Sequence, residues 1–250
     1  MKHSLKVLSA LLTYPSADLQ AAVPEMRAAL DAECRLPRHN RDRLERLLEE
    51  LATHDLYDLQ ERYVLLFDRT RSLSLHLFEH VHGESRDRGQ AMVDLKSLYE
   101  RHGLFMDSSE LPDHLPLFLE FLSQIPETDA RDLLQETSHV LEAIRLRLKK
   151  RKSPYFSVFS CAQILARAKP QPEILAALVG EPDEDPNDLA ALDAAWEEEE
   201  VTFGPAAAPS GQCGKEGIAA KLRAARRPAP GMPASEPKRP VVTYSQSART

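Results

Sequence analysis

The segment Leu56-Tyr-Asp-Leu-Gln-Glu-Arg-Tyr-Val-Leu-Leu-Phe67 carries apolar side chains at positions 56, 59, 63, 66 and 67. This spacing follows the helical period of 3.6 residues per turn, so these side chains share one face of an α-helix. A half-buried strand would instead place apolar side chains at every second position. The segment therefore predicts an amphipathic helix whose apolar face packs on a core.

Helical spacing recurs along most of residues 1–180. One apolar stripe runs from Met92 to His102 and is followed by Gly103, a residue typical of the position after a helix. A longer stripe at positions 133, 134, 137, 140, 141, 144 and 148 predicts one continuous helix. Residues 113–125 are apolar on more than one face and predict a central helix, with Pro116 tolerated in its first turn. We expect an all-α fold, a single compact domain of roughly eight helices.

Composition narrows the class of protein. The chain has 250 residues, of which 42% are hydrophobic and 28% charged, as in a soluble globular protein. The formal net charge of −7 disfavours nucleic acid as a partner, because phosphate must be neutralised by Lys and Arg. Three widely spaced cysteines give neither a disulfide framework nor a Cys-x-x-Cys metal knuckle, which fits a reducing compartment.

The N-terminal stretch predicts an amphipathic first helix. Its apolar run from Val7 to Leu12 is short for a signal peptide, and no small-residue cleavage site follows before Tyr14-Pro15. No stretch approaches the ~20 apolar residues needed to span a membrane. We therefore expect a cytoplasmic protein without a membrane span.

Composition changes sharply near residue 180. Residues 181–200 carry ten acidic and no basic side chains, whereas residues 201–250 carry eight basic and two acidic ones. We expect residues 1–180 to form the helical domain, 181–200 to be an acidic segment with a last helix at 188–196, and 201–250 to be a disordered Pro/Ala-rich basic tail. Such a tail buries too little apolar surface to offset its chain entropy.

The segment His76-Leu-Phe-Glu-His-Val-His-Gly-Glu-Ser85 raises the question of a metal site. Its first five residues fit the H-x-x-E-H pattern of zinc peptidases, in which His76 and His80 would bind zinc and Glu79 would be the general base. A third ligand is required, and the spacing does not choose among His82, Glu84 and Glu142. The alternative is that these histidines flank core residues or form an interface.

Three segments together resemble a known family. They are Tyr63-Val-Leu-Leu-Phe-Asp-Arg69, the stretch from Leu73 to Leu95, and Glu110-Leu-Pro-Asp-His-Leu-Pro-Leu-Phe-Leu-Glu-Phe-Leu122. They are similar to the Y-x-x-L-F motif, the NarJ-branch segment and the E-P-x-D-H element of the TorD/DmsD/NarJ redox-enzyme maturation proteins. Within these, the chain looks like a NarJ-type nitrate reductase molybdenum cofactor assembly chaperone, or delta subunit, from about Leu5 to Gly180.

The resemblance implies a TorD-like helical fold without enzymatic activity or catalytic residues. It implies binding to the N-terminal peptide, and to a second region, of the apo catalytic α subunit of nitrate reductase. The chaperone would permit insertion of bis-molybdopterin guanine dinucleotide into that client and membrane assembly of the complex. It would hold no cofactor or metal stably itself and would be absent from the finished enzyme. The resemblance also suggests molybdenum cofactor delivery proteins as further partners.

An apolar groove with acidic rims suits an amphipathic client helix with basic residues. The side chains expected to contact the client peptide are Tyr63, Leu66, Phe67, Asp68, Phe78, His80, His82, Arg86, Asp113, His114, Phe118, Glu120 and Phe121. Core packing is the alternative for the phenylalanines, and helix capping is the alternative for Asp113 and His114. We expect Phe67→Ala or Asp113→Ala to leave a folded protein that binds the client weakly.

Two other functions stay open at this point. One is a zinc-dependent hydrolase that uses His76, Glu79 and His80. The other is the same chaperone role for a different molybdoenzyme, such as a sulfoxide or N-oxide reductase.

Overall fold

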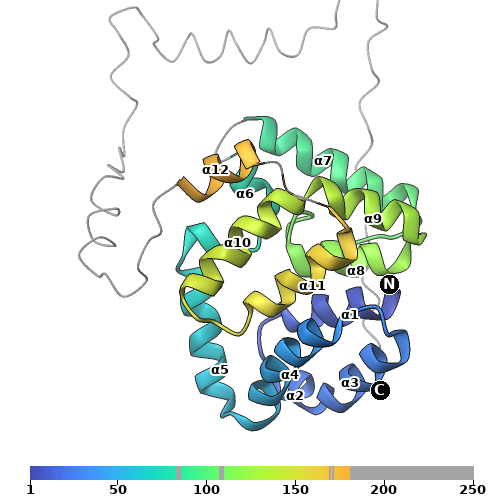
Figure 1. Ribbon diagram of the computed structural model, residues 1–250. Helices are drawn as coiled ribbons and strands as arrows, with labels where there is room; N and C mark the ends of the chain where they lie inside the picture. Colours follow the sequence, from blue (N-terminus) through green and yellow to red (C-terminus); the bar gives the residue numbers. More distant parts are fainter. Residues whose placement is uncertain (83–85, 107–109, 169, 171, 181–250) are drawn as a thin grey trace, which may run out of the picture. The chain divides into compact units, whose positions relative to one another are not determined.

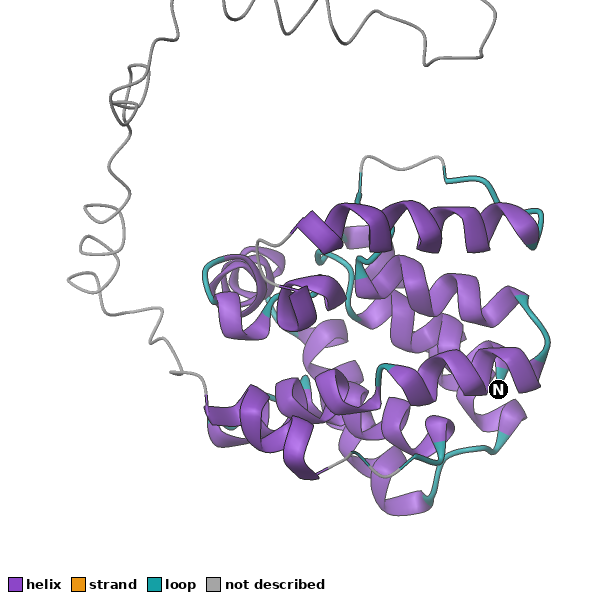
Figure 2. Ribbon diagram, turned by 90° about the horizontal axis from the view of Figure 1, so that it is seen from above, coloured by secondary structure: helices purple, strands orange, loops and turns teal. Residues whose placement is uncertain are grey.

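The computed structural model describes residues 1–82, 86–106, 110–168, 170 and 172–180, and for His82, Arg86 and Asp87 it describes the backbone only. This part of the chain is helical and contains no β-strand (Figure 2). The α-helices are α1 (Lys2–Leu11), α2 (Ala17–Ala21), α3 (Val23–Glu33), α4 (Arg38–Thr53), α5 (Leu56–Tyr63), α6 (Leu77–His82), α7 (Arg86–Arg101), α8 (Leu115–Gln124), α9 (Glu127–Glu136), α10 (Ser138–Lys150), α11 (Phe156–Ala166) and α12 (Pro172–Gly180). A π-helix, η1 (Val64–Asp68), follows α5, and a 3₁₀ turn, η2 (Arg71–Leu73), follows η1. The all-α prediction is confirmed.

The described residues contain twelve α-helices, more than the roughly eight expected. Part of the difference comes from the apolar stripe between 133 and 148, which is divided between two helices. α9 ends at Glu136 and α10 begins at Ser138, with Thr137 as the cap residue between them. The Thr137 hydroxyl donates to the carbonyl of Leu134 at 3.0 Å. The side chains keep helical spacing across the break, so periodicity alone does not reveal it.

The core is built around α1 and α8, which pack against each other along their lengths, while α10 packs on α11 (Figure 1). Leu5 and Leu8 of α1 and Leu119 of α8 are almost completely buried. The Ser9 hydroxyl donates to the carbonyl of Pro116 at 2.6 Å and joins the two helices. The prediction of a central helix in residues 113–125 is therefore confirmed.

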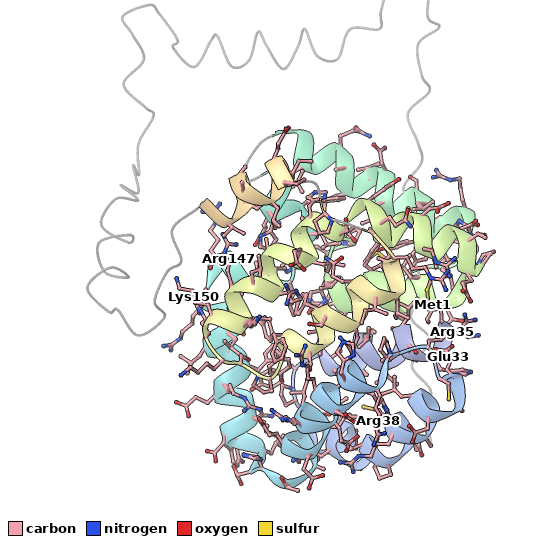
Figure 3. All side chains as sticks on the ribbon, viewed as in Figure 1. Met1, Glu33, Arg35, Arg38, Arg147 and Lys150 are labelled. Carbon is pink, nitrogen blue, oxygen red and sulfur yellow. The ribbon has the colours of Figure 1, made fainter. Side chains whose placement is uncertain are left out.

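Two charged groups join elements at the edges of the core. The Met1 ammonium lies 2.7 Å from Oε1 of Glu33 (Figure 3). Burial alone would raise the pKa of Glu33, but hydrogen bonds from Met1, Ser4 and the backbone of His3 lower that pKa to about 2. Arg147 of α10, which is also labelled in Figure 3, is 4% exposed and donates to the carbonyls of Ser72 at 2.8 Å and Leu178 at 2.5 Å. Arg147 thereby links η2 to α12.

The end of α7 follows the local sequence. Gly103 adopts a φ of 74° after α7, as expected for a residue that ends a helix.

None of the helices in the described ranges has the length and apolar character required to cross a bilayer. The acidic segment 181–200, its expected helix at 188–196 and the tail 201–250 lie outside the described residues.

Candidate functional site

Two adjoining hollows form a continuous depression, which we call the central groove. Their volumes are about 490 and 480 Å³, and they share Tyr63, Asp68, His76 and His114. The first hollow is lined in addition by Phe67, Arg69, Arg71, Ser74, Leu75, Glu79 and Arg88. The second is lined in addition by Ser9, Thr13, Tyr14, Glu110, Pro116, Leu117 and Glu120. Segments far apart in the sequence therefore meet at one surface.

Backbone hydrogen bonds hold the middle of the groove together. The N–H of Leu77 donates to the carbonyl of Asp113 at 3.1 Å, and the N–H of Leu115 donates to the carbonyl of Leu75 at 2.8 Å. These bonds form an isolated antiparallel bridge between His76 and His114, whose rings lie 5.2 Å apart. The residues just before α6 are thus fixed to those just before α8.

Asp113 is completely buried and contacts His76, a residue that lines the groove. Its Oδ2 accepts a hydrogen bond from the N–H of Phe78 at 3.0 Å, in the first turn of α6, and its Oδ1 lies 3.3 Å from Nδ1 of His76. Burial alone would raise the pKa of Asp113, but the bonds from His76 and Phe78 lower it. The same contact with Asp113 raises the pKa of His76, against the opposing effect of burial. The carboxylate therefore positions His76 and the start of α6 together.

The π-helix η1 supplies one wall of the groove. Tyr63, at the end of α5, packs against Phe67 in a tilted arrangement with ring centroids 5.0 Å apart, and its hydroxyl donates to the carbonyl of Leu12 at 2.8 Å. Phe67 in turn contacts the ring of Tyr155 at 5.1 Å and is 5% exposed. Asp68, the next residue, is exposed to the groove. A π-turn widens the helix by one residue per turn and is frequent at functional sites.

Charge is distributed unevenly along the groove. The first hollow contains Arg69, Arg71 and Arg88, and Arg88 lies 3.1 Å from Glu79. The second contains Glu110 and Glu120. Asp68 belongs to both, and burial together with the charge of Glu110 raises its pKa.

The sequence of this region decides the family. Residues 15–160 match the sequence profile of the family described as "Nitrate reductase delta subunit". The chain belongs to the nitrate reductase delta subunit family. The resemblance drawn from the sequence is therefore confirmed.

Individual relatives of this delta-subunit family member cover most of the chain. It is 45% identical over 199 residues to the nitrate reductase molybdenum cofactor assembly chaperone NarJ of Escherichia coli K12, covering 80% of this chain and 84% of NarJ. It is 39% identical over 199 residues to NarW of the same strain, covering 80% of this chain and 83% of NarW, whose name refers to the same assembly process. A crystal structure from Archaeoglobus fulgidus, described as a redox enzyme maturation protein, aligns with a TM-score of 0.46 and 25% identity, over 67% of this chain and 92% of the other.

The delta-family motifs supply only part of the groove. Of the residues expected to contact a client, Tyr63, Phe67, Asp68, His114 and Glu120 line it. His80 is half-buried, and its Nε2 lies 2.8 Å from the carbonyl of Ser74. The side chains of His82 and Arg86 lie outside those that the structure describes.

Several other expected contacts are core or supporting residues. Leu66 and Phe118 are buried and line neither hollow of the groove. Phe78 packs against the core. Asp113 acts as a cap, but for α6 rather than for the helix that follows it in sequence. Asp113 thus supports α6 from 35 residues away in the sequence, whereas His114, which directly precedes α8, makes no side-chain capping bond to that helix.

Phe121 lines a separate hollow of about 400 Å³, which adjoins the groove and is more apolar than its two hollows. It stacks on Tyr99 with ring centroids 4.4 Å apart, and Leu117 and Glu120 continue this hollow into the groove. Phe105 lines the same hollow and is 79% exposed, which is unusual for a large apolar side chain.

Sequence reasoning missed much of the groove's charge. Glu110 belongs to one of the segments that resemble the family, Arg69 ends another, and Arg71 follows two residues later. The sequence therefore contained a signal for these acidic and basic groove residues. Ser9, Thr13 and Tyr14 come from the end of α1 and the turn after it, and no local pattern distinguished them from an ordinary helix end.

The zinc interpretation does not match the local geometry. His76 precedes α6, which begins at Leu77, so His76 and His80 do not occupy the same helical face four residues apart. His76 instead faces Asp113, and His80 faces the carbonyl of Ser74. Among the described side chains, no group of three His, Cys, Asp or Glu residues is placed to bind one metal ion.

Proposed function

We propose that this protein is a cytoplasmic assembly chaperone for respiratory nitrate reductase that does not catalyse a reaction. It binds the N-terminal segment, and a second region, of the apo catalytic subunit in the central groove and in the adjoining apolar hollow that contains Phe121. It holds that subunit while bis-molybdopterin guanine dinucleotide is inserted and the membrane complex assembles. Proteins that deliver the cofactor are further partners of the same assembly.

The observation that carries this proposal is the family membership, together with 45% identity to a protein named as such a chaperone over most of both chains. The groove supports it physically. Aromatic side chains such as Tyr14 and Tyr63 and the aliphatic Leu117 offer apolar contacts, and Asp68 and Glu110 offer charge for basic client residues.

Co-purification tests the proposal. The full chain should retain the apo catalytic subunit and lose most of it when the client's first ~20 residues, about 30 Å of helix, are deleted. Cells that lack this protein should accumulate catalytic subunit without its molybdenum cofactor. Equal retention of the truncated client, or normal cofactor content in those cells, would contradict the proposal.

A groove variant and a matched surface variant refine the test. Leu117→Glu places a charge where two hollows meet and should weaken the complex about tenfold or more, which corresponds to about 1.4 kcal/mol. Val93→Glu introduces the same charge at an exposed position of α7, which no described hollow includes. It should bind like the unmodified chain.

A further inference from the structure

We propose that the central groove favours one direction of the bound client segment over the other. The N-terminal end of the bound helix lies beside Glu110 and Glu120, and its C-terminal end lies beside Arg69, Arg71 and Arg88. This inference rests on the proposed function, since it concerns how the client lies in the groove.

The groove's two ends differ in the sign of their charge. The first hollow is lined by three arginines together with the carboxylates of Asp68 and Glu79, whereas no arginine lines the second. The second hollow is lined by three carboxylates, those of Asp68, Glu110 and Glu120, and its described lining includes no Lys or Arg. The groove is therefore electrically polar along its length.

Local ion pairs reduce this polarity without removing it. At the basic end, Arg88 is paired with Glu79 at 3.1 Å, while Arg69 is exposed and lines the first hollow. At the acidic end, Glu120 lies 2.7 Å from Lys6 in a pair whose two side chains are about half exposed. Such exposed pairs are weak, so Glu120 can exchange Lys6 for a client cation.

Asp68, which both hollows share, and Glu110 of the second hollow together favour a client cation. The pKa of Asp68 is raised by burial and by the negative charge of Glu110, so the two groups disfavour each other's ionisation. A Lys, an Arg or the α-ammonium of a client placed between them relieves this repulsion.

A bound helix has the matching polarity. Its N-terminal end carries a partial positive charge from unpaired N–H groups, and its C-terminal end carries a partial negative charge from unpaired carbonyls. In the proposed direction, each end of the client helix meets side chains of the opposite sign. In the reverse direction, both ends meet side chains of like sign. These two contributions together should favour the proposed direction by about tenfold.

Photo-crosslinking determines the direction. The probe is a synthetic peptide of the client's first ~20 residues with a benzophenone side chain in either its first or its last helical turn. With the full chain, the first-turn probe should label the segment around Glu110 and Leu117, and the last-turn probe should label the segment from Arg69 to Glu79. The opposite pattern, or equal labelling of both segments by both probes, would overturn the proposed direction. Absence of measurable peptide binding would instead overturn the proposed function.

Charge reversal provides an independent test. Arg69→Glu should weaken a peptide with Glu in its last turn about fivefold to tenfold, and should weaken it less when that residue is Lys. Arg46→Glu, an exposed position on α4 outside every described hollow, is the matched control and should leave both affinities unchanged. Equal effects of Arg69→Glu on the two peptides would contradict the proposal.

Discussion

Substitutions of Asp113 should distinguish two contributions to the stability of the protein: the hydrogen bond from Phe78 and the charge interaction with His76. Asp113→Ala removes the acceptor for the Phe78 N–H and the partner of His76. A buried N–H left without an acceptor costs about 1–3 kcal/mol. The His76 contact, at 3.3 Å, is long for a charge-assisted bond, so its loss should cost about 1 kcal/mol. The expected loss is about 2–4 kcal/mol, a large part of the 5–15 kcal/mol typical of a domain.

Asp113→Asn is the conservative comparison. Its amide oxygen can still accept from Phe78, so it should lose only about 1 kcal/mol, the part that depends on the negative charge. Urea unfolding followed by far-UV circular dichroism measures both variants, and nearly equal slopes would show that the folded and unfolded states are otherwise comparable.

The effect of Asp113→Asn should depend on pH. The folded pKa of His76 is raised, so its stabilisation is complete below the ordinary value of 6.5 and is lost as pH rises through the folded pKa. The folded pKa of Asp113 is lowered, so its stabilisation is present above 3.8 and is lost as pH falls through the folded pKa. The variant should therefore lose more stability near pH 5.5 than near pH 8.5. A difference that is the same at both values, or Asn as harmful as Ala, would refute this account of the pair.

Three further outcomes are expected. Phe67→Ala should destabilise the protein by about 3–5 kcal/mol in thermal or urea unfolding, because Phe67 is buried between two rings, so weak client binding by this variant would reflect stability as well as contact. Client-peptide affinity, measured by calorimetry, should fall between about pH 8 and pH 5.5, because protonation of His76 adds positive charge beside a basic peptide; a flat profile would exclude this effect. Arg147→Met should raise hydrogen exchange in α12 about tenfold over other helices, because the carbonyl of Leu178 loses a charged donor, and unchanged exchange would show that α12 is held by its apolar contacts.

Periodicity was sufficient for the fold class and for several elements. Gly103 after α7 and Pro116 in the first turn of α8 act through backbone preferences that need no tertiary information. The break at Thr137 and the π-turn at Val64–Asp68 were not foreseen, because both keep the apolar side chains near the positions that an unbroken helix would give.

The groove was predictable in its motifs but not in its three-dimensional arrangement. Tyr63, Asp68 and His114 were chosen from recognised patterns and line the same surface. The patterns could not distinguish Phe118, which faces the core, from Leu117, which faces the groove, because residues 113–125 are apolar on several faces. That distinction depends on where α1 packs.

The antiparallel bridge between His76 and His114 also bears on when the protein becomes competent during synthesis. Part of the groove comes from α1 and the turn after it, near the start of the chain. His114, which completes the bridge with His76, lies about a hundred residues later in the sequence. A nascent chain that has not yet released α8 from the ribosome has neither the acidic end of the groove nor a partner for the residues that precede α6. Non-local contacts of this kind form late, since a long loop must close before they are made. An incompletely made copy should therefore be unable to capture a client prematurely.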